Sequence, residues 1–146
     1  MNLRHREKGK RALKVSGILP DTCVWIEYFK PGASALKQTL ERLLLNESIF
    51  VCGPILYELV QGLRSDKEKT VIVDAMKSLE YIEMSEDLWI KAGEISSTLR
   101  KSGKTLPLSD VIIAAIVIKN NLSIFTTDKH FEEIKEVLIY PIASIQ

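Results

Sequence analysis

The chain has 146 residues, of which 46% are hydrophobic and 27% charged, and its net charge is +1. This length fits one compact domain, and the composition is typical of a globular protein and excludes a disordered one. The longest apolar run, residues 111–118, is far shorter than the roughly 20 residues that span a bilayer. Lys14 and Pro20 interrupt the N-terminal apolar stretch before it could form a secretory signal. We therefore expect a cytoplasmic protein without membrane contact.

Positive charge is concentrated in residues 1–14, which hold six of the 20 basic and one of the 19 acidic residues. These residues carry +5, which leaves 14 basic and 18 acidic residues, or −4, for the remainder. We expect residues 1–14 to form a flexible basic tail and residues 15–146 to form the folded domain. Because the folded domain carries −4, a bound cation or the basic tail must supply the positive charge that attracts nucleic acid.

The cysteines and histidines are few. Cys23 and Cys52 lack a CxxC spacing, so the sequence indicates neither a zinc knuckle nor a disulfide framework, and we expect both to be small buried side chains. With only His5 and His130, the sequence does not indicate a metal site built from several histidines.

The first third of the chain alternates between strand and helix patterns. Residues 15–19 are apolar with a β-branched start, which predicts a strand that ends at Pro20. Residues 22–29 predict a short helix and residues 33–45 an amphipathic one, and residues 48–52 predict a second strand.

The next helix begins at Gly53 and Pro54, because proline is favoured in a first helical turn. Apolar residues predict its buried stripe, namely Leu56, Leu59, Val60 and Leu63. Glu58 projects to the opposite side of this helix.

The remaining elements continue the alternation. We predict helices over residues 67–79, 86–100, 109–119 and 129–135, and strands over residues 81–84, 123–126 and 137–140. Residues 109–119 are apolar almost all round, which predicts a helix buried between layers, with Ser109 as its cap and Asp110 in its first turn.

This alternation, without hairpin signals, predicts a mainly parallel sheet of short strands with helices on both faces. Ligands of such sheets bind at the carboxyl ends of the strands. Asp21 and Asp128 follow two of the predicted strands and occupy that position.

Each acid also has a simpler interpretation. Asp21 and Asp128 can each cap the helix that follows, and a cap can still bind metal. Asp110 lies at the start of a buried helix and must find water, a hydrogen-bond donor or a cation, because burying a bare carboxylate is costly. Glu58 alone is most simply a solvated charge on a polar helix face.

Four segments together resemble the PIN-domain family, and more specifically its VapC-like toxins from toxin–antitoxin pairs. They are residues 18–26 (ILPDTCVWI), 57–62 (YELVQG), 106–115 (LPLSDVIIAA) and 125–131 (FTTDKHF). Each segment is short, but their order and spacing within residues 17–142 make the combination specific. Cys23 departs from the family pattern, in which serine or asparagine is common at this position.

The resemblance implies a three-layer α/β/α domain that cleaves RNA with a Mg²⁺- or Mn²⁺-activated water. It also implies a cognate VapB-like antitoxin and a homodimer. The family's catalytic, metal-binding acids carry over to Asp21, Glu58, Asp110 and Asp128, and Thr126 matches a position where the family often has a hydroxyl.

These residue types suit the chemistry, because a hard cation such as Mg²⁺ prefers oxygen ligands. Four gathered acids repel one another, so their pKa values should be raised without a cation. If the basic tail does not bind RNA, the cation and nearby loops, through Arg64 and Lys104, are left to hold the substrate.

Two other classes of protein compete with this interpretation. One is a degenerate PIN domain that binds RNA or assembles without cleavage, although a scaffold has no physical need to gather four acids. The other is a receiver-like signalling domain, which would need a pair of adjacent acids near its first strand, and residues 18–20 offer none.

Overall fold

The structure is a computed structural model that describes residues 15–142, so the predicted basic tail lies outside the described residues. Its strands are short and every pairing between them is parallel. In chain order they are β1 (Gly17–Pro20), β2 (Phe50–Cys52), β3 (Glu80–Ile82), β4 (Leu122–Phe125) and β5 (Leu138–Ile139).

The strands form two groups, β1-β4-β5 and β2-β3. A parallel bridge between Ile18 and Ile49 joins the groups, and the Ile18 backbone N–H donates to Ser48 O over 2.9 Å. The strand order across the molecule is therefore β3-β2-β1-β4-β5, and the predicted parallel sheet of short strands is confirmed.

Six α-helices and one 3₁₀ helix accompany these strands in the described part of the chain. They are α2 (Thr22–Phe29), α3 (Ala35–Asn46), α4 (Gly53–Gln61), α5 (Asp66–Lys77), α6 (Glu86–Lys101), α7 (Leu108–Lys119) and the 3₁₀ helix η1 (Lys129–Glu133). None of them is long and apolar enough to cross a bilayer.

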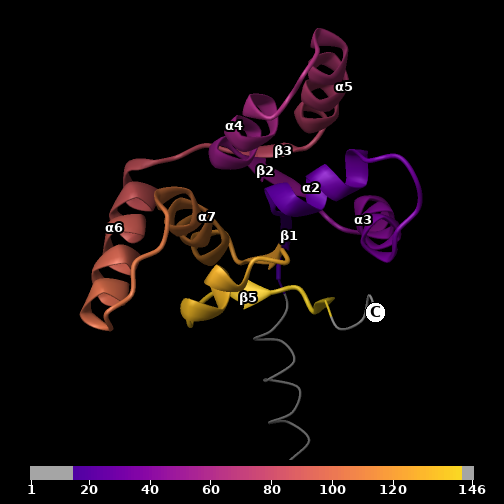
Figure 1. Cartoon of the computed structure of the whole chain (residues 1–146). Coiled ribbons are helices and arrows are strands. Elements are labelled where there is room, and N and C mark those ends of the chain that lie inside the picture. Colours follow the sequence, from indigo (N-terminus) through magenta and orange to yellow (C-terminus); the bar gives the residue numbers. More distant parts are fainter. Residues whose placement is uncertain (1–14, 143–146) are drawn as a thin grey trace, which may run out of the picture.

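The helices form a layer on each side of the sheet. Helices α2 and α3 lie on one side, and α6 and α7 on the other (Figure 1). Every residue of β1 and β4 is buried, as expected for strands covered on both faces. The three-layer α/β/α prediction is confirmed.

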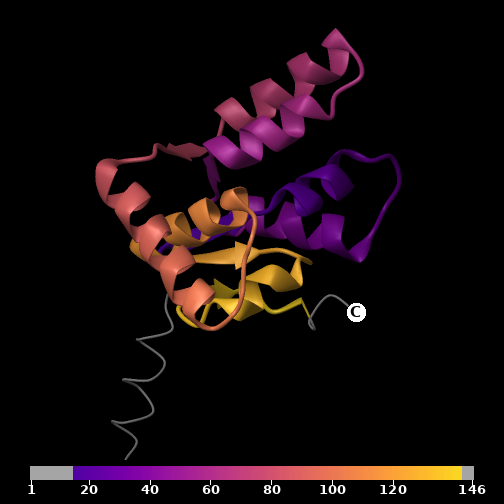
Figure 2. The same ribbon diagram turned by 60° about the vertical axis from the view of Figure 1, so that its left-hand side comes forward.

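Helices α4 and α5 pack against each other and project from this three-layer body (Figure 2).

Helix α7 is the most deeply buried element. All eight residues from position 110 to position 117 are buried, so the prediction of a helix enclosed between layers is confirmed. Ile113 and Ile116 are fully inaccessible, and truncating such a side chain to alanine costs about 2–5 kcal/mol. This packing holds the first turn of α7 in a fixed place beside the sheet.

The start of α7 differs from the prediction. The helix begins at Leu108, and Pro107 occupies the cap position without a side-chain hydrogen bond, so the predicted Ser109 cap is wrong. The ring of Pro107 fixes φ at −56° and directs the chain into the helix before Ser109 is reached. Asp110 lies in the first turn, as predicted.

The predicted stripe on α4 is also partly wrong. Ile55 and Leu59 are buried, but Val60 is 37% exposed. Because α4 belongs to the projecting helix pair, only a narrow part of its surface is covered. The helix predicted over residues 129–135 is a 3₁₀ helix, η1, that ends two residues earlier, at Glu133.

Candidate metal centre

The register of the sheet brings the first predicted acid beside Thr126. Pro20, the last residue of β1, pairs with Phe125, the last residue of β4, and the Asp21 N–H donates to Phe125 O over 2.8 Å. One residue further, Asp21 Oδ2 accepts from Thr126 Oγ1 over 2.7 Å, and Asp21 Oδ1 accepts from the Thr22 N–H over 2.8 Å. Asp21 is therefore both the cap of α2, as predicted, and a buried carboxylate at the sheet edge.

Thr126 also connects the first acid to the last. Its Oγ1 accepts from the Asp128 N–H over 2.9 Å, so one hydroxyl bonds to Asp21 and to the backbone of Asp128. Asp128 caps η1, and its Oδ1 accepts from the His130 N–H over 2.9 Å, which confirms the predicted cap. The side chain of Asp128 remains 36% exposed.

Asp110 reaches this group from α7, and His130 joins it from η1. His130 Nδ1 lies 2.8 Å from Asp110 Oδ2 and 3.4 Å from Asp128 Oδ1. The ligand atoms of these three residues all lie within 4.8 Å of one another. The Asp110 side chain is only 12% exposed, whereas His130 is 50% exposed.

The sequence patterns do not identify His130 as a member of this group. The chain has too few histidines for a multi-histidine site, but a mixed site needs only one. The available signal was the Asp128-x-His130 spacing, because two residues so close in one short turn can face the same point.

Glu58 lies on α4, half-buried, and approaches the group from a different element. Its negative charge contributes to the raised pKa of the Asp21 carboxyl, which places the two acids within electrostatic reach. It also lines a groove described below. The structure therefore does not show Glu58 as a fully solvated side chain.

The electrostatics of the site are dominated by buried negative charge. Burial raises the pKa of Asp21, the charges of Glu58 and Asp128 raise it further, and hydrogen bonds from Thr126 and Thr22 oppose the rise. Burial also raises the pKa of Asp110, with contributions from Asp128 and Asp21, while His130 opposes it. The hydrogen bond to Asp110, followed by the charge of Asp128, raises the pKa of His130.

These acids have no basic partner other than His130 within the described part of the chain. No lysine or arginine among residues 15–142 forms an ion pair with Asp21, Glu58, Asp110 or Asp128. Buried carboxylates without a counter-ion are costly, and oxygen ligands suit a hard divalent cation. The residues present therefore fit such a cation.

The two cysteines behave differently. Cys52 is fully buried, as predicted, and burial raises the pKa of its thiol to about 12. Cys23 is only half-buried, with its Sγ 3.9 Å from Asp21 Oδ2, and it accepts from Thr127 Oγ1 over 3.3 Å. The prediction that both are buried hydrophobes is wrong for Cys23, because α2 turns this residue towards the sheet edge.

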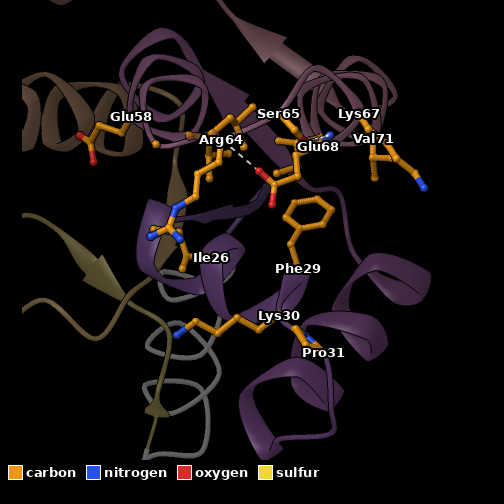
Figure 3. Close-up of a pocket in the computed structure, with 14 residues that line it drawn as sticks. Ile26, Phe29, Lys30, Pro31, Glu58, Arg64, Ser65, Lys67, Glu68 and Val71 are labelled. Carbon is orange, nitrogen blue, oxygen red and sulfur yellow. Dashed lines mark hydrogen bonds between the residues drawn. The ribbon is translucent and has the colours of Figure 1, made fainter.

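An apolar groove of about 520 Å³ lies beside Glu58, between α2 and the α4–α5 pair (Figure 3). Its apolar walls come from both sides, namely Ile26, Phe29, Leu59, Leu63, Val71 and Ile72. Lys30, Arg64 and Lys67 line it too, and Figure 3 shows the Arg64 side chain extending towards Ile26. We refer to this feature as the α2–α4 groove.

The two basic side chains that were considered for holding the substrate, Arg64 and Lys104, lie in different environments. Arg64 lines the α2–α4 groove, whereas Lys104 forms an ion pair with Glu133. The charge of Lys104 is therefore already compensated, and the role of both residues towards RNA stays a prediction.

The chain is similar to known proteins over most of its length. The family model described as PIN domain matches residues 18–137. Ribonuclease VapC1 of Methanocaldococcus jannaschii is 31% identical over 137 residues, which cover 93% of this chain and 94% of that protein. Ribonuclease VapC11 of Mycobacterium tuberculosis is 29% identical over 133 residues, covering 88% and 99%.

Solved structures share the fold. The structure of VapBC-1 from nontypeable Haemophilus influenzae superposes with a TM-score of 0.73 at 19% identity, covering 86% of this chain and 98% of that one. The chain belongs to the PIN-domain family. This membership shows that the receiver-like alternative is wrong.

Proposed function

We propose that this protein is an endoribonuclease that depends on Mg²⁺ or Mn²⁺ and acts as the toxin of a toxin–antitoxin pair. The observation that supports it most directly is the gathering of Asp21, Asp110 and Asp128 around Thr126 and His130, just beyond the ends of β1 and β4. The charge of Glu58 acts on the same group, because it helps raise the pKa of Asp21. Relatives that align along nearly their full length carry the name ribonuclease.

In this proposal Asp21, Glu58, Asp110 and Asp128 are the catalytic acids that hold the cation. When bound, such a cation lowers the pKa of water and offsets the negative charge that develops on the phosphoryl oxygens. The two hydrogen bonds on Asp21 restrict its carboxylate, so this ligand is preorganised. Thr126 is a positioning residue, since it restrains Asp21 and the backbone of Asp128.

The partner of the proposed toxin is a cognate VapB-like antitoxin. Solved structures with this fold include a toxin–antitoxin complex from Klebsiella pneumoniae and the DNA-bound VapBC of Salmonella typhimurium. We assign the antitoxin contact to the α2–α4 groove, because its apolar walls suit the apolar face of an amphipathic peptide, and its three basic side chains outnumber the acidic Glu58 and Glu68. An occupant there lies beside Glu58 and can obstruct the acids.

We further propose a homodimer that acts in the cytoplasm. Several large apolar side chains are exposed on the described surface, including Tyr57 and Leu108 at 68% each and Trp89 at 52%. Apolar surface of this kind is typical of a protein that associates. Light scattering of the purified chain gives the mass in solution, and a monomeric mass at micromolar concentration contradicts the dimer.

The test of the function is RNA cleavage by the purified protein. Single-stranded RNA is incubated with Mg²⁺, with Mn²⁺ or with excess chelator, and Asp21→Asn serves as the inactive control. We expect cleavage with either cation and none with chelator or with the variant. RNA binding without cleavage under every condition supports the degenerate PIN module instead.

A further inference from the structure

His130 is held in a fixed relation to two of the acids. Its backbone N–H donates to Asp128 Oδ1 over 2.9 Å, which closes the first turn of η1. The next residue, Phe131, is completely buried and anchors this turn in the core. The backbone of His130 is therefore fixed, and the contact of Nδ1 with Asp110 Oδ2 over 2.8 Å holds the imidazole, although half of its surface is exposed.

The distances around His130 suit ligands that share one ion. Around an octahedral ion with ligands at about 2.1 Å, neighbouring ligand atoms lie about 3 Å apart. His130 Nδ1 lies 2.8 Å from Asp110 Oδ2 and 3.4 Å from Asp128 Oδ1. All three ligand atoms fall within 4.8 Å of one another, so small side-chain movements bring them around a single ion.

The chemistry of the imidazole separates it from the four acids. Mg²⁺ takes oxygen ligands and retains several waters, whereas first-row transition ions also accept imidazole nitrogen. We propose that His130 Nδ1 is a further ligand of the cation held by Asp110 and Asp128, and that it makes the centre prefer Mn²⁺ over Mg²⁺. This inference rests on the metal site of the proposed function and adds a nitrogen ligand to its carboxylates.

A different role for His130 has the opposite consequence. If the imidazole only compensates the charge of the acids and leaves when a cation enters, it competes with the metal. Removing His130 would then strengthen the binding of Mn²⁺ and Mg²⁺ alike. The sign of the change in affinity therefore distinguishes a ligand from a competitor.

The experiment measures metal binding without a substrate. Mn²⁺ is added to the full chain, and pulsed electron paramagnetic resonance records the coupling between the Mn²⁺ electrons and directly bonded ¹⁴N. We expect this coupling in the parent and in Lys129→Ala, a matched control on the same turn, and its loss in His130→Asn. Coupling that persists in His130→Asn, or that is absent from the parent, overturns the proposal.

Calorimetric titrations with Mn²⁺ and Mg²⁺ give the second readout. We expect the Mn²⁺ dissociation constant to rise at least about tenfold in His130→Asn, with a much smaller change for Mg²⁺. An unchanged or lower Mn²⁺ dissociation constant overturns the proposal. His130→Gln is the second variant should His130→Asn fail to fold, as judged by circular dichroism.

The outcomes separate this inference from the proposed function. A parent that cleaves RNA with Mn²⁺ but shows no ¹⁴N coupling leaves the ribonuclease intact and removes the His130 ligand. A parent that shows the coupling but cleaves no RNA with any divalent cation keeps the ligand and removes the ribonuclease.

Discussion

The candidate site has two sides that are built differently. One side, which we call the sheet-edge cluster, consists of Asp21, Thr126, Asp128, Asp110 and His130, joined by hydrogen bonds of 2.7–2.9 Å. The other side is Glu58 alone, on the projecting α4–α5 pair. Within the described part of the chain, Glu58 makes no hydrogen bond or ion pair through its carboxylate.

The difference follows from what positions each side. The register of β1 and β4 and the buried packing of α7 fix the sheet-edge cluster before any cation binds. Glu58 depends on the placement of a helix pair that packs less deeply, and it also lines the α2–α4 groove. The sheet-edge cluster is therefore the preorganised part of the centre, and Glu58 is the part that an occupant of the groove can reach.

The largest expected effect comes from the sheet-edge cluster. Asp110→Asn keeps the size of the side chain but removes its charge, and we expect RNA cleavage to fall at least about 100-fold, equivalent to about 2.7 kcal/mol. Glu58→Gln should cost less, about tenfold. The measurement is the initial rate with saturating Mn²⁺, with circular dichroism as the control for folding. If Asp110→Asn cleaved RNA at the parental rate, the sheet-edge cluster would not be the more important side of the site.

Stabilisation by metal gives the next test. A cation that binds only the folded state at 100 times its Kd stabilises it by about 2.7 kcal/mol, so Mn²⁺ should raise the Tm of the parent. We expect Asp110→Asn to lose most of this shift, Glu58→Gln to retain more of it, and Asp74→Asn, an exposed acid on α5, to retain all of it. Equal shifts in the parent and Asp110→Asn would contradict the account.

Thr126 tests whether the hydrogen bonds within the sheet-edge cluster matter. Thr126→Val removes the donor to Asp21 Oδ2 and the acceptor for the Asp128 N–H. A hydrogen bond to a charged group contributes about 1.5–3 kcal/mol, so we expect Mn²⁺ affinity to fall about tenfold. Thr126→Ser keeps the hydroxyl and should restore the affinity. Equal affinities for the valine and serine variants would show that the hydroxyl has no positioning role.

The smallest expected effect is on stability without metal. Burial raises the pKa of Asp21 in the folded state above 3.8. Between 3.8 and the raised pKa the folded state binds more protons than the unfolded state, so the stability of the parent falls as pH rises through this window. Asp21→Asn does not titrate at this position. The unfolding free energy of the variant minus that of the parent should therefore increase with pH and level off above the raised pKa.

Denaturant unfolding at a series of pH values, with chelator present, measures this difference. Asp66→Asn, at an exposed position in the first turn of α5, is the control and should give no comparable trend. A difference between Asp21→Asn and the parent that stays constant or decreases with rising pH would show that burial does not govern the protonation of Asp21.

The sequence predicts the layers and much of the site because its patterns are local. The sequence predicts helix 22–29 at its observed bounds, because Asp21 is a capping residue before it and Pro31 and Gly32, which disfavour a helix, follow it. The apolar run of α7 predicted a buried helix because no polar face was available. The strand ends predicted where Asp21 and Asp128 lie, because parallel strands share their carboxyl edge.

The parts that the sequence did not predict depend on contacts between distant residues. The meeting of His130 with Asp110 requires α7 and η1 to pack together, which no spacing in the chain reveals. Val60 is exposed because the α4–α5 pair projects from the rest of the domain. Cys23 is half-buried at the sheet edge, where Thr127 from the far end of the sequence donates to its thiol. The resemblance to the family predicts which four acids form the site, whereas only the structure shows that Thr126 bonds to the Asp21 carboxylate and to the backbone of Asp128.

The central claim is that acids from separate elements form one cation site at the carboxyl edge of β1 and β4. Crystals of the full chain grown with Mn²⁺ and measured at the manganese absorption edge test it most directly. We expect an anomalous peak bonded to Asp110 and Asp128, with Asp21 on the same ion or joined to it through one water. A well-ordered site without an anomalous peak, or a peak only at other surface acids, would contradict it.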